Sequence, residues 1–141
     1  MSMSVARLLA GILLMGALVF VGAGHPLAGE APSGAKQSVQ GGGVTVDVTL
    51  LKERSDAPTF QVVLDTHSLN LDGYRFEEIV RLRDGRGGEI APVAVEGAKG
   101  SGHHREATVR FAWPEPKPKS LELVVKGVAD AQERVFRWPS Q

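Results

Sequence analysis

Two short segments of the chain carry residue types that could bind a metal ion. The first is LDTHS, which contains Asp65 and His67, and the second is GHHRE, which contains the adjacent His103 and His104. Neutral imidazoles together with a carboxylate suit Zn²⁺ or Cu²⁺. The chain has no cysteine, so a site for copper or zinc would use His67 and His104, with Asp65 or His103 as further donors.

The same residues also support a structural interpretation, in which they brace the loops. The imidazoles could bond to backbone carbonyls, Asp65 could accept a hydrogen bond from Ser68 or a backbone N–H in an Asx-type turn, and Arg105 could pair with an acidic neighbour. Adjacent residues of an extended chain point to opposite sides, so His103 and His104 cannot both join one site unless the glycine loop bends. No HExxH-like spacing decides between metal binding and bracing.

The chain that must position these residues is dominated by alternating apolar and polar residues. This alternation is typical of half-buried strands, and DGRGG and other glycine-rich stretches mark the turns between them. We expect seven strands, at residues 44–51, 60–65, 79–83, 89–95, 106–113, 121–126 and 134–138. No long helix is predicted, so we expect an all-β fold, a seven-stranded antiparallel immunoglobulin-like β-sandwich.

This topology predicts where the histidines lie. Consecutive strands alternate in direction, so the connections after the second and fourth strands emerge at the same end of the domain. Alternation also places Asp65, His67, His104 and Glu106 on the outward faces of the second and fifth strands. These two strands are antiparallel neighbours in the immunoglobulin arrangement, so we expect the four side chains to form one cluster.

The first 23 residues have the pattern of a signal peptide. Arg7 precedes the apolar run Leu8 to Val21, and Val21-Gly22-Ala23 fits a small-x-small cleavage site. Left uncleaved, the same segment could act as an N-terminal anchor, although a run of about 14 to 17 residues is short for a hydrocarbon core of about 30 Å. We therefore expect a periplasmic or secreted protein, in contact with the membrane only if this segment is retained.

Residues 24–43 are rich in Gly, Ala, Pro, Ser and Gln. Such a segment buries too little apolar surface to offset its ordering entropy, which predicts a flexible leader. The folded domain is then expected to span residues 44–141.

Composition and motifs exclude several classes of function. The 141 residues include 16 Lys and Arg against 16 Asp and Glu, without the basic excess of a nucleic-acid-binding protein. Ser101 lies near His103, but no nucleophile elbow accompanies them. Trp113 and Trp138 end two strands and are expected in the core, whereas a carbohydrate-binding sandwich would need a row of exposed aromatic rings.

Three segments resemble the pattern of a family of small exported bacterial immunoglobulin-like proteins, in which LDTHS is followed by GHHR or GHHV and by a closing R-x-F-W-like strand. They are LDTHSLNLDGY (64–74), GHHREATVRF (102–111) and RVFRW (134–138). The resemblance spans residues 44–138, and no established activity comes with it. Its positions in the two histidine segments are Asp65, Thr66, His67, Ser68, Gly102, His103, His104 and Arg105.

The sequence therefore predicts a non-enzymatic, exported immunoglobulin-like module of the cell envelope. It would bind a protein partner through the end that carries the histidines, with structural or interaction roles for Thr66, Ser68, Gly102, Arg105 and Glu106. The alternative is a copper- or zinc-binding or delivery domain that uses the histidines and Asp65.

Overall fold

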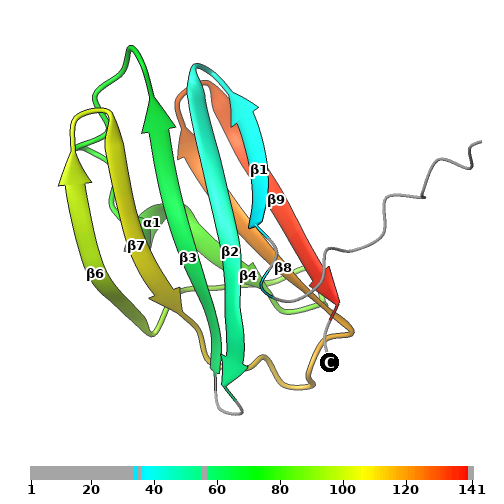
Figure 1. Ribbon diagram of the computed structural model, residues 1–141. Coiled ribbons are helices and arrows are strands. Elements are labelled where there is room, and N and C mark those ends of the chain that lie inside the picture. Colours follow the sequence, from blue (N-terminus) through cyan, green and yellow to red (C-terminus); the bar gives the residue numbers. More distant parts are fainter. Residues whose placement is uncertain (1–33, 35, 55–56, 140–141) are drawn as a thin grey trace, which may run out of the picture.

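The computed structural model of the protein describes residues 34, 36–54 and 57–139. These residues form two antiparallel β-sheets that pack face to face as a sandwich, with one short helix beside them (Figure 1). The expected all-β fold with antiparallel sheets is confirmed. The predicted signal peptide, residues 1–23, and residues 24–33 of the predicted leader lie outside the described residues.

The first sheet has five strands and the second has four. Across the first sheet the order is β1 (Lys36–Gly41), β2 (Val44–Arg54), β3 (Ala57–Thr66), β7 (His104–Arg110) and β6 (Ala94–Ser101). Across the second sheet it is β5 (Glu89–Ile90), β4 (Val80–Arg83), β8 (Ser120–Val128) and β9 (Ala131–Pro139). The helix α1 (Phe76–Ile79) leads directly into β4, the strand predicted at residues 79–83.

The core lies between the sheets and is built by the predicted alternation. The inward-facing residues of β2 and β3 are fully buried, as are the inward aromatic residues of β9. The Trp138 ring lies 5.3 Å from the Phe60 ring and 6.4 Å from the Phe136 ring, centroid to centroid. Trp113 is partly buried against the same core, so both tryptophans contribute to packing as expected.

The predicted boundary between leader and domain is wrong, because Lys36–Gly41 forms β1, the edge strand of the first sheet. β1 buries little apolar surface beyond Val39, which packs against the core. Backbone pairing with β2 orders it instead, and Lys36 Nζ donates a hydrogen bond to Asp47 at 3.0 Å. Gly42 and Gly43 have φ of +60° and +78°, which allows the two-residue turn that returns the chain to β2.

The count of seven strands is also wrong, since the described residues form nine. Besides β1, the additional strand arises because the predicted strand 89–95 divides into β5 of one sheet and β6 of the other. Pro92 lies at this change of sheet, where its missing N–H ends a strand. β6 continues through the expected glycine loop, with an irregular register between Glu96 and Lys99 that accommodates the positive φ of Gly97.

Four connections meet at one end of the sandwich, at the top of Figure 1, and we call this end the histidine pole. They are the β1–β2 turn, the segment 67–75 after β3, the β6–β7 turn and the β8–β9 turn. The last residue of β9, Pro139, lies at the opposite end, whereas β1 starts at Lys36 beside Thr49, about midway along β2. In the described part of the chain, no helix is long and apolar enough to cross a membrane.

Candidate functional site: the histidine pole

Asp65 and His104 form the centre of the predicted cluster. β3 and β7 are antiparallel neighbours, as expected, and Asp65 pairs directly with His104 in their register. The His104 Nδ1 and Asp65 Oδ1 atoms are 2.5 Å apart on the outward face of the sheet. Their side chains are 54% and 46% exposed, so the pair lies at the surface of the domain.

Glu106 shares this outward face but bonds to other residues. Its carboxylate receives a hydrogen bond from Gln61 Nε2 at 3.1 Å and pairs with Lys99 Nζ at 2.7 Å. The hydrogen bond from Lys99 is the largest influence on the pKa of Glu106 and lowers it. Glu106 therefore belongs to a β3–β7–β6 polar row beside the Asp65–His104 pair, and does not bond to His104.

His67 and His103 lie at the same end as His104, which confirms the predicted strand polarity. The backbone N–H of Thr66 donates to the carbonyl of His103 at 2.9 Å, so the two histidine segments are in direct contact. The His67 and His103 side chains are exposed, and among the described residues neither imidazole makes a hydrogen bond or ion pair. The predicted four-residue cluster is thus reduced to the Asp65–His104 pair, with His67 and His103 displayed around it.

Thr66 organises the start of the segment that follows β3. Its hydroxyl donates a hydrogen bond to the carbonyl of Gly43 at 2.7 Å and accepts from the N–H groups of Ser68 and Leu69, each at 3.3 Å. The side chain is only 7% exposed. Thr66, and not Asp65 as predicted, therefore accepts the hydrogen bonds of this turn. Asp65 pairs with His104 instead.

Arg105 holds the rest of the same segment. Its Nη1 atom donates to the carbonyls of Leu71 at 3.0 Å, Asp72 at 3.4 Å and Tyr74. The guanidinium carbon also lies 5.4 Å from the ring centroid of Phe76. Among the described residues Arg105 forms no ion pair with a carboxylate within 4 Å; its bonds go to loop carbonyls, and its charge is only one of the lesser causes that lower the pKa of Glu77.

The β6–β7 turn completes the contact between the two motifs. The N–H of Gly102 donates to Asp72 Oδ1 at 2.8 Å, and its carbonyl accepts from the N–H of Leu71 at 2.8 Å. Gly102 has φ of +65°, as a glycine in the first central position of a type II′ turn does. One backbone bond to Leu71 and one bond to the Asp72 side chain thus dock the loop on Gly102, which agrees with the structural role expected for this residue.

Two further residues at this pole were not singled out from the sequence. Tyr74 accepts a hydrogen bond on its hydroxyl oxygen from the N–H of Ala129 at 2.9 Å. Arg134, 3% exposed, donates to the carbonyls of Val128 at 2.9 Å and Gly41 at 2.6 Å. Burial is the main cause that lowers the pKa of Arg134. Arg134 lies two residues before the inward-facing Phe136, and this spacing along a strand indicates that Arg134 also points inward.

The arrangement offers little to a metal ion within one copy of the chain. In the part that the structure describes, no group of three or more His, Asp or Glu side chains is placed to hold a metal. Oδ1 of Asp65 pairs with Nδ1 of His104. Among the described residues, His104 Nε2 is then the one imidazole nitrogen that could bind a metal on a ring held in place by a neighbouring side chain. Metal binding by His67, His103, His104 and Asp65 stays a prediction.

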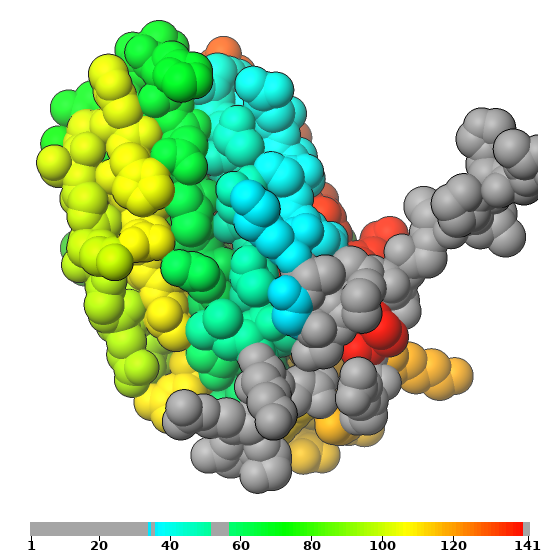
Figure 2. Space-filling model, in the orientation of Figure 1, coloured from blue at the N-terminus to red at the C-terminus, as the bar shows by residue number. Residues whose placement is uncertain are grey.

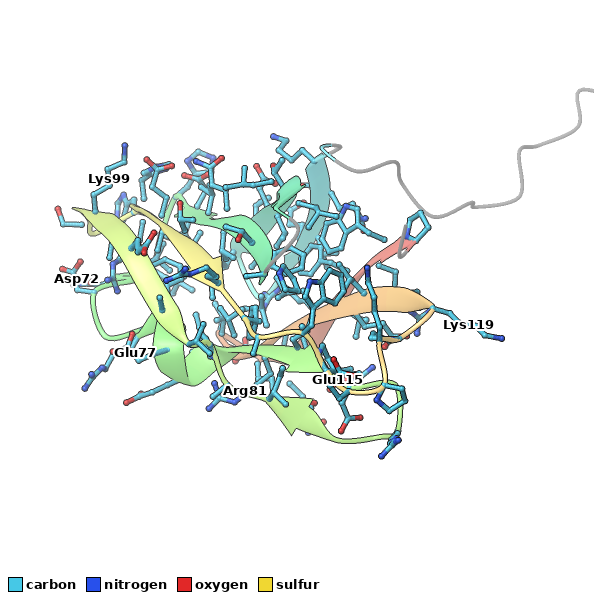
Figure 3. All side chains as sticks on the ribbon, turned by 90° about the horizontal axis from the view of Figure 1, so that it is seen from below. Asp72, Glu77, Arg81, Lys99, Glu115 and Lys119 are labelled. Atoms are coloured by element: carbon cyan, nitrogen blue, oxygen red, sulfur yellow. The ribbon has the colours of Figure 1, made fainter. Side chains whose placement is uncertain are left out.

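A separate groove of about 770 Å³ lies away from the histidine pole. It is bordered by the turn that joins β4 to β5 and by the proline-rich segment before β8, which includes Pro116 and Pro118. Figure 3 shows Lys119 extending outward on this side of the molecule, remote from Asp72 and Lys99. No motif pointed to this region, and its residues provide control positions for experiments on the histidine pole.

Comparison with protein-family models, curated proteins and solved structures found no match to this chain. The resemblance carried by LDTHS, GHHR and RVFRW therefore stays a prediction.

Proposed function

We propose that the protein is a non-enzymatic, exported immunoglobulin-like module of the cell envelope that binds a protein partner through the histidine pole. One observation carries the proposal. The segment after β3 and the β6–β7 turn are tied together by hydrogen bonds through Thr66, Gly102 and Arg105, yet His67 and His103 remain on the surface.

The order of the strands supports the immunoglobulin-like assignment. In the first sheet the sequence β2-β3-β7-β6 corresponds to the order A-B-E-D of a constant-type domain, and in the second sheet β4-β8-β9 corresponds to C-F-G. β1 is then an additional edge strand beside A, and β5 a short strand beside C. Loops at one end of such a scaffold are a common location for binding residues.

The physical advantage of this pole is that its loops are already ordered. A loop that must become ordered on binding costs about 0.5 to 1.5 kcal/mol for each immobilised side chain. Here the Arg105 and Thr66 contacts hold the backbone of the segment before any partner arrives. Leu69, a large apolar residue with 36% exposure, is presented beside His67 and adds an apolar contact to the polar surface.

Export is supported by the signal pattern of residues 1–23. A protein cleaved after Ala23 would reach the periplasm or the medium, and its lack of cysteine makes the domain independent of disulfide formation. A retained segment would place the same domain beside the membrane.

Site-directed photocrosslinking in cells tests the proposal. A photoreactive residue at His67 or His103 should give a discrete adduct with one envelope protein, whereas the same residue at Arg86 or Lys119, beside the remote groove, should not. Exchange of Leu69 to Asp should reduce the adduct at His103 without changing the level of the protein. Equal adducts at all four positions, or none at the histidine pole, would count against this function.

A further inference from the structure

We propose that the outer edge of β9, which no other strand pairs with in the described residues, is a second interaction surface and that its partner is β9 of a second copy of this chain. The two strands would pair antiparallel around Val135 and join the two four-stranded sheets into one sheet of eight strands. The second sheet ends at β9, and in Figure 1 and Figure 2 this strand, in red, lies behind β1 at the right of the sandwich.

The side chain of Gln37 shows how the edge accepts a partner. Gln37 Nε2 donates to the carbonyl of Arg137 at 2.6 Å, and the N–H of Arg137 donates to Gln37 Oε1 at 3.3 Å. One amide group thus forms both bonds that a residue of a neighbouring strand would form. The backbone of Arg137 is therefore directed away from β8 and toward the open edge.

The same direction applies to two further residues of β9. The β8–β9 register is regular from Glu133 to Trp138, and backbone groups alternate along an antiparallel strand between the two sides. Since the backbone N–H and C=O of Arg137 point to the open edge, those of Val135 and Glu133 point there as well. Among the described residues, Gln37 is the one group bonded to this edge between Glu133 and Arg137. The outward N–H and C=O groups of Val135 and Glu133 therefore have no partner among the described residues and can pair with another strand.

The side chains along this edge are complementary to themselves. When two copies of β9 pair antiparallel with Val135 opposite Val135, Glu133 of each copy lies opposite Arg137 of the other. The two side chains are 43% and 60% exposed and lie on the outer face of the sheet. Directly opposed unlike charges stabilise a strand pair, whereas like charges destabilise it.

The pairing would also extend a charge network that exists within one copy. Glu133 pairs with Arg83 at 3.0 Å, and Arg137 pairs with Glu122 at 2.9 Å. Val135 is partly buried on this face opposite Val124, which is fully buried. The centre of the new strand pair would therefore be apolar and its two ends charged.

Such an interface has two-fold symmetry and closes at two copies. It involves a short stretch of each chain, so it belongs with weak interfaces that form at high local concentration, below the roughly 1,000 Å² of stable ones. Gln37 opposes it, because each copy must release its Gln37 from Arg137 before the strands can pair fully. β1 would thereby control how readily the edge is available.

Sedimentation equilibrium of the purified protein over a range of concentrations tests this inference. The wild type should show weak monomer–dimer association, and Gln37→Ala should lower the dissociation constant roughly tenfold, because competing hydrogen bonds are removed from both copies. Gln40→Ala is the matched control, since Gln40 is an exposed glutamine of the same strand whose side chain makes no hydrogen bond to another described residue. Gln40→Ala should leave the association unchanged.

Two kinds of variant define the register. Val135→Pro removes an N–H that faces the edge and should abolish association, while the β8–β9 ladder and the circular dichroism spectrum are retained. Glu133→Arg and Arg137→Glu should each weaken association, and the double variant should restore it. Monomeric behaviour of both wild type and Gln37→Ala at all concentrations would overturn the inference, as would association that survives Val135→Pro. Association that resists the single charge reversals would overturn the register.

Discussion

Asp65 and His104 are 39 residues apart in the chain, yet they lie directly opposite each other on β3 and β7, with Oδ1 and Nδ1 separated by 2.5 Å. Both side chains are about half exposed, and such surface pairs contribute little to stability, with typical values of about 0 to 1 kcal/mol. The pair marks where the two motifs meet. The contacts that hold the motifs together are those of Arg105, which is partly buried, and of Thr66, which is buried.

Replacing Arg105 with alanine should lower the free energy of unfolding by about 2 to 3 kcal/mol, since hydrogen bonds from a charged group to loop carbonyls are lost. Arg110→Ala is the control, because the Arg110 contact to Glu96 is an exposed pair at 3.6 Å, and its loss should cost less than about 0.5 kcal/mol. Urea unfolding measures both values. Amide hydrogen exchange should also quicken at Leu71 in the Arg105 variant, and equal stabilities of the two variants would contradict the role of Arg105.

The hydroxyl of Thr66 makes a separate prediction. Thr66→Val keeps the shape of the side chain but leaves the Gly43 carbonyl and two loop N–H groups without their partner, which should cost about 1 to 3 kcal/mol. Thr66→Ser retains the hydroxyl and should cost clearly less. Thermal or urea unfolding compares the two, and a valine variant as stable as the serine variant would show that the hydroxyl is unimportant.

The acid stability of the domain should depend on Asp47. Partial burial raises the pKa of Asp47, but hydrogen bonds from Ser38 and Lys36 outweigh burial and hold it below its ordinary value of 3.8. A carboxyl whose pKa is lower in the folded state stabilises the fold at neutral pH, and this contribution is lost as the pH falls below 3.8 and through the folded value. Asp47→Asn should therefore lower the free energy of unfolding at neutral pH. The difference in stability between this variant and the wild type should become smaller in acid.

Unfolding free energies measured from about pH 7 to about pH 2.5 check this dependence. Asp130→Asn, an exposed carboxyl in the β8–β9 turn, is the control and should leave the acid profile nearly parallel to that of the wild type. A constant difference between Asp47→Asn and the wild type at every pH would be inconsistent with the lowered pKa.

The packing of Gly42 against the β8–β9 turn should make this glycine hard to replace. A Cβ at residue 42 would lie 2.8 Å from the Asp130 nitrogen and 2.9 Å from the Ala129 Cβ, at φ of +60°. Gly127→Ala is a matched control, because Gly127 has a similar φ of +67° and open space around it. The control should lower the free energy of unfolding by the conformational cost alone, about 1 to 2 kcal/mol. Gly42→Ala should lower it by more, as measured by urea unfolding.

Metal binding can be tested directly by calorimetric titration of Zn²⁺ and Cu²⁺ into the wild type, His67→Ala and His104→Ala. Since one oriented imidazole is available in the described part of each copy, we expect weak binding that His67→Ala leaves unchanged. Saturable binding at one ion per chain that either substitution abolishes would instead establish the metal site.

The position of the histidine segments could be predicted because it follows from local patterns. Period-two alternation gives the inward and outward faces of β3 and β7, and strand direction gives the end at which each connection emerges. Together they predicted that Asp65 and His104 share one outward-facing cluster and that His67, His103 and His104 lie at the same end of the domain. The roles of Arg105 and Thr66 could not be derived in this way, because their partners are backbone carbonyls whose positions depend on how the loop folds.

The β1 strand was missed for a related reason. The segment Lys36–Gly41 has little apolar character of its own, and its order depends on hydrogen bonds to β2 and on the Asp47 side chain. Composition measures what a segment can bury, and it does not register what a neighbouring strand can pair with. The division of residues 89–95 between two sheets could not be predicted either, because it depends on which neighbouring strand each half pairs with. Pro92 lies at the point of division.

The described domain ends at the pole opposite the histidine pole, because Pro139 at the end of β9 pairs with Ser120 at the start of β8. β1 begins elsewhere, since Lys36 pairs with Thr49, about midway along the eleven residues of β2, and the strand runs from there toward the histidine pole. A tether that holds the chain by its leader would therefore reach the domain at the side of the first sheet, roughly 17 Å from the tip that carries His67 and His103 at the usual rise per residue.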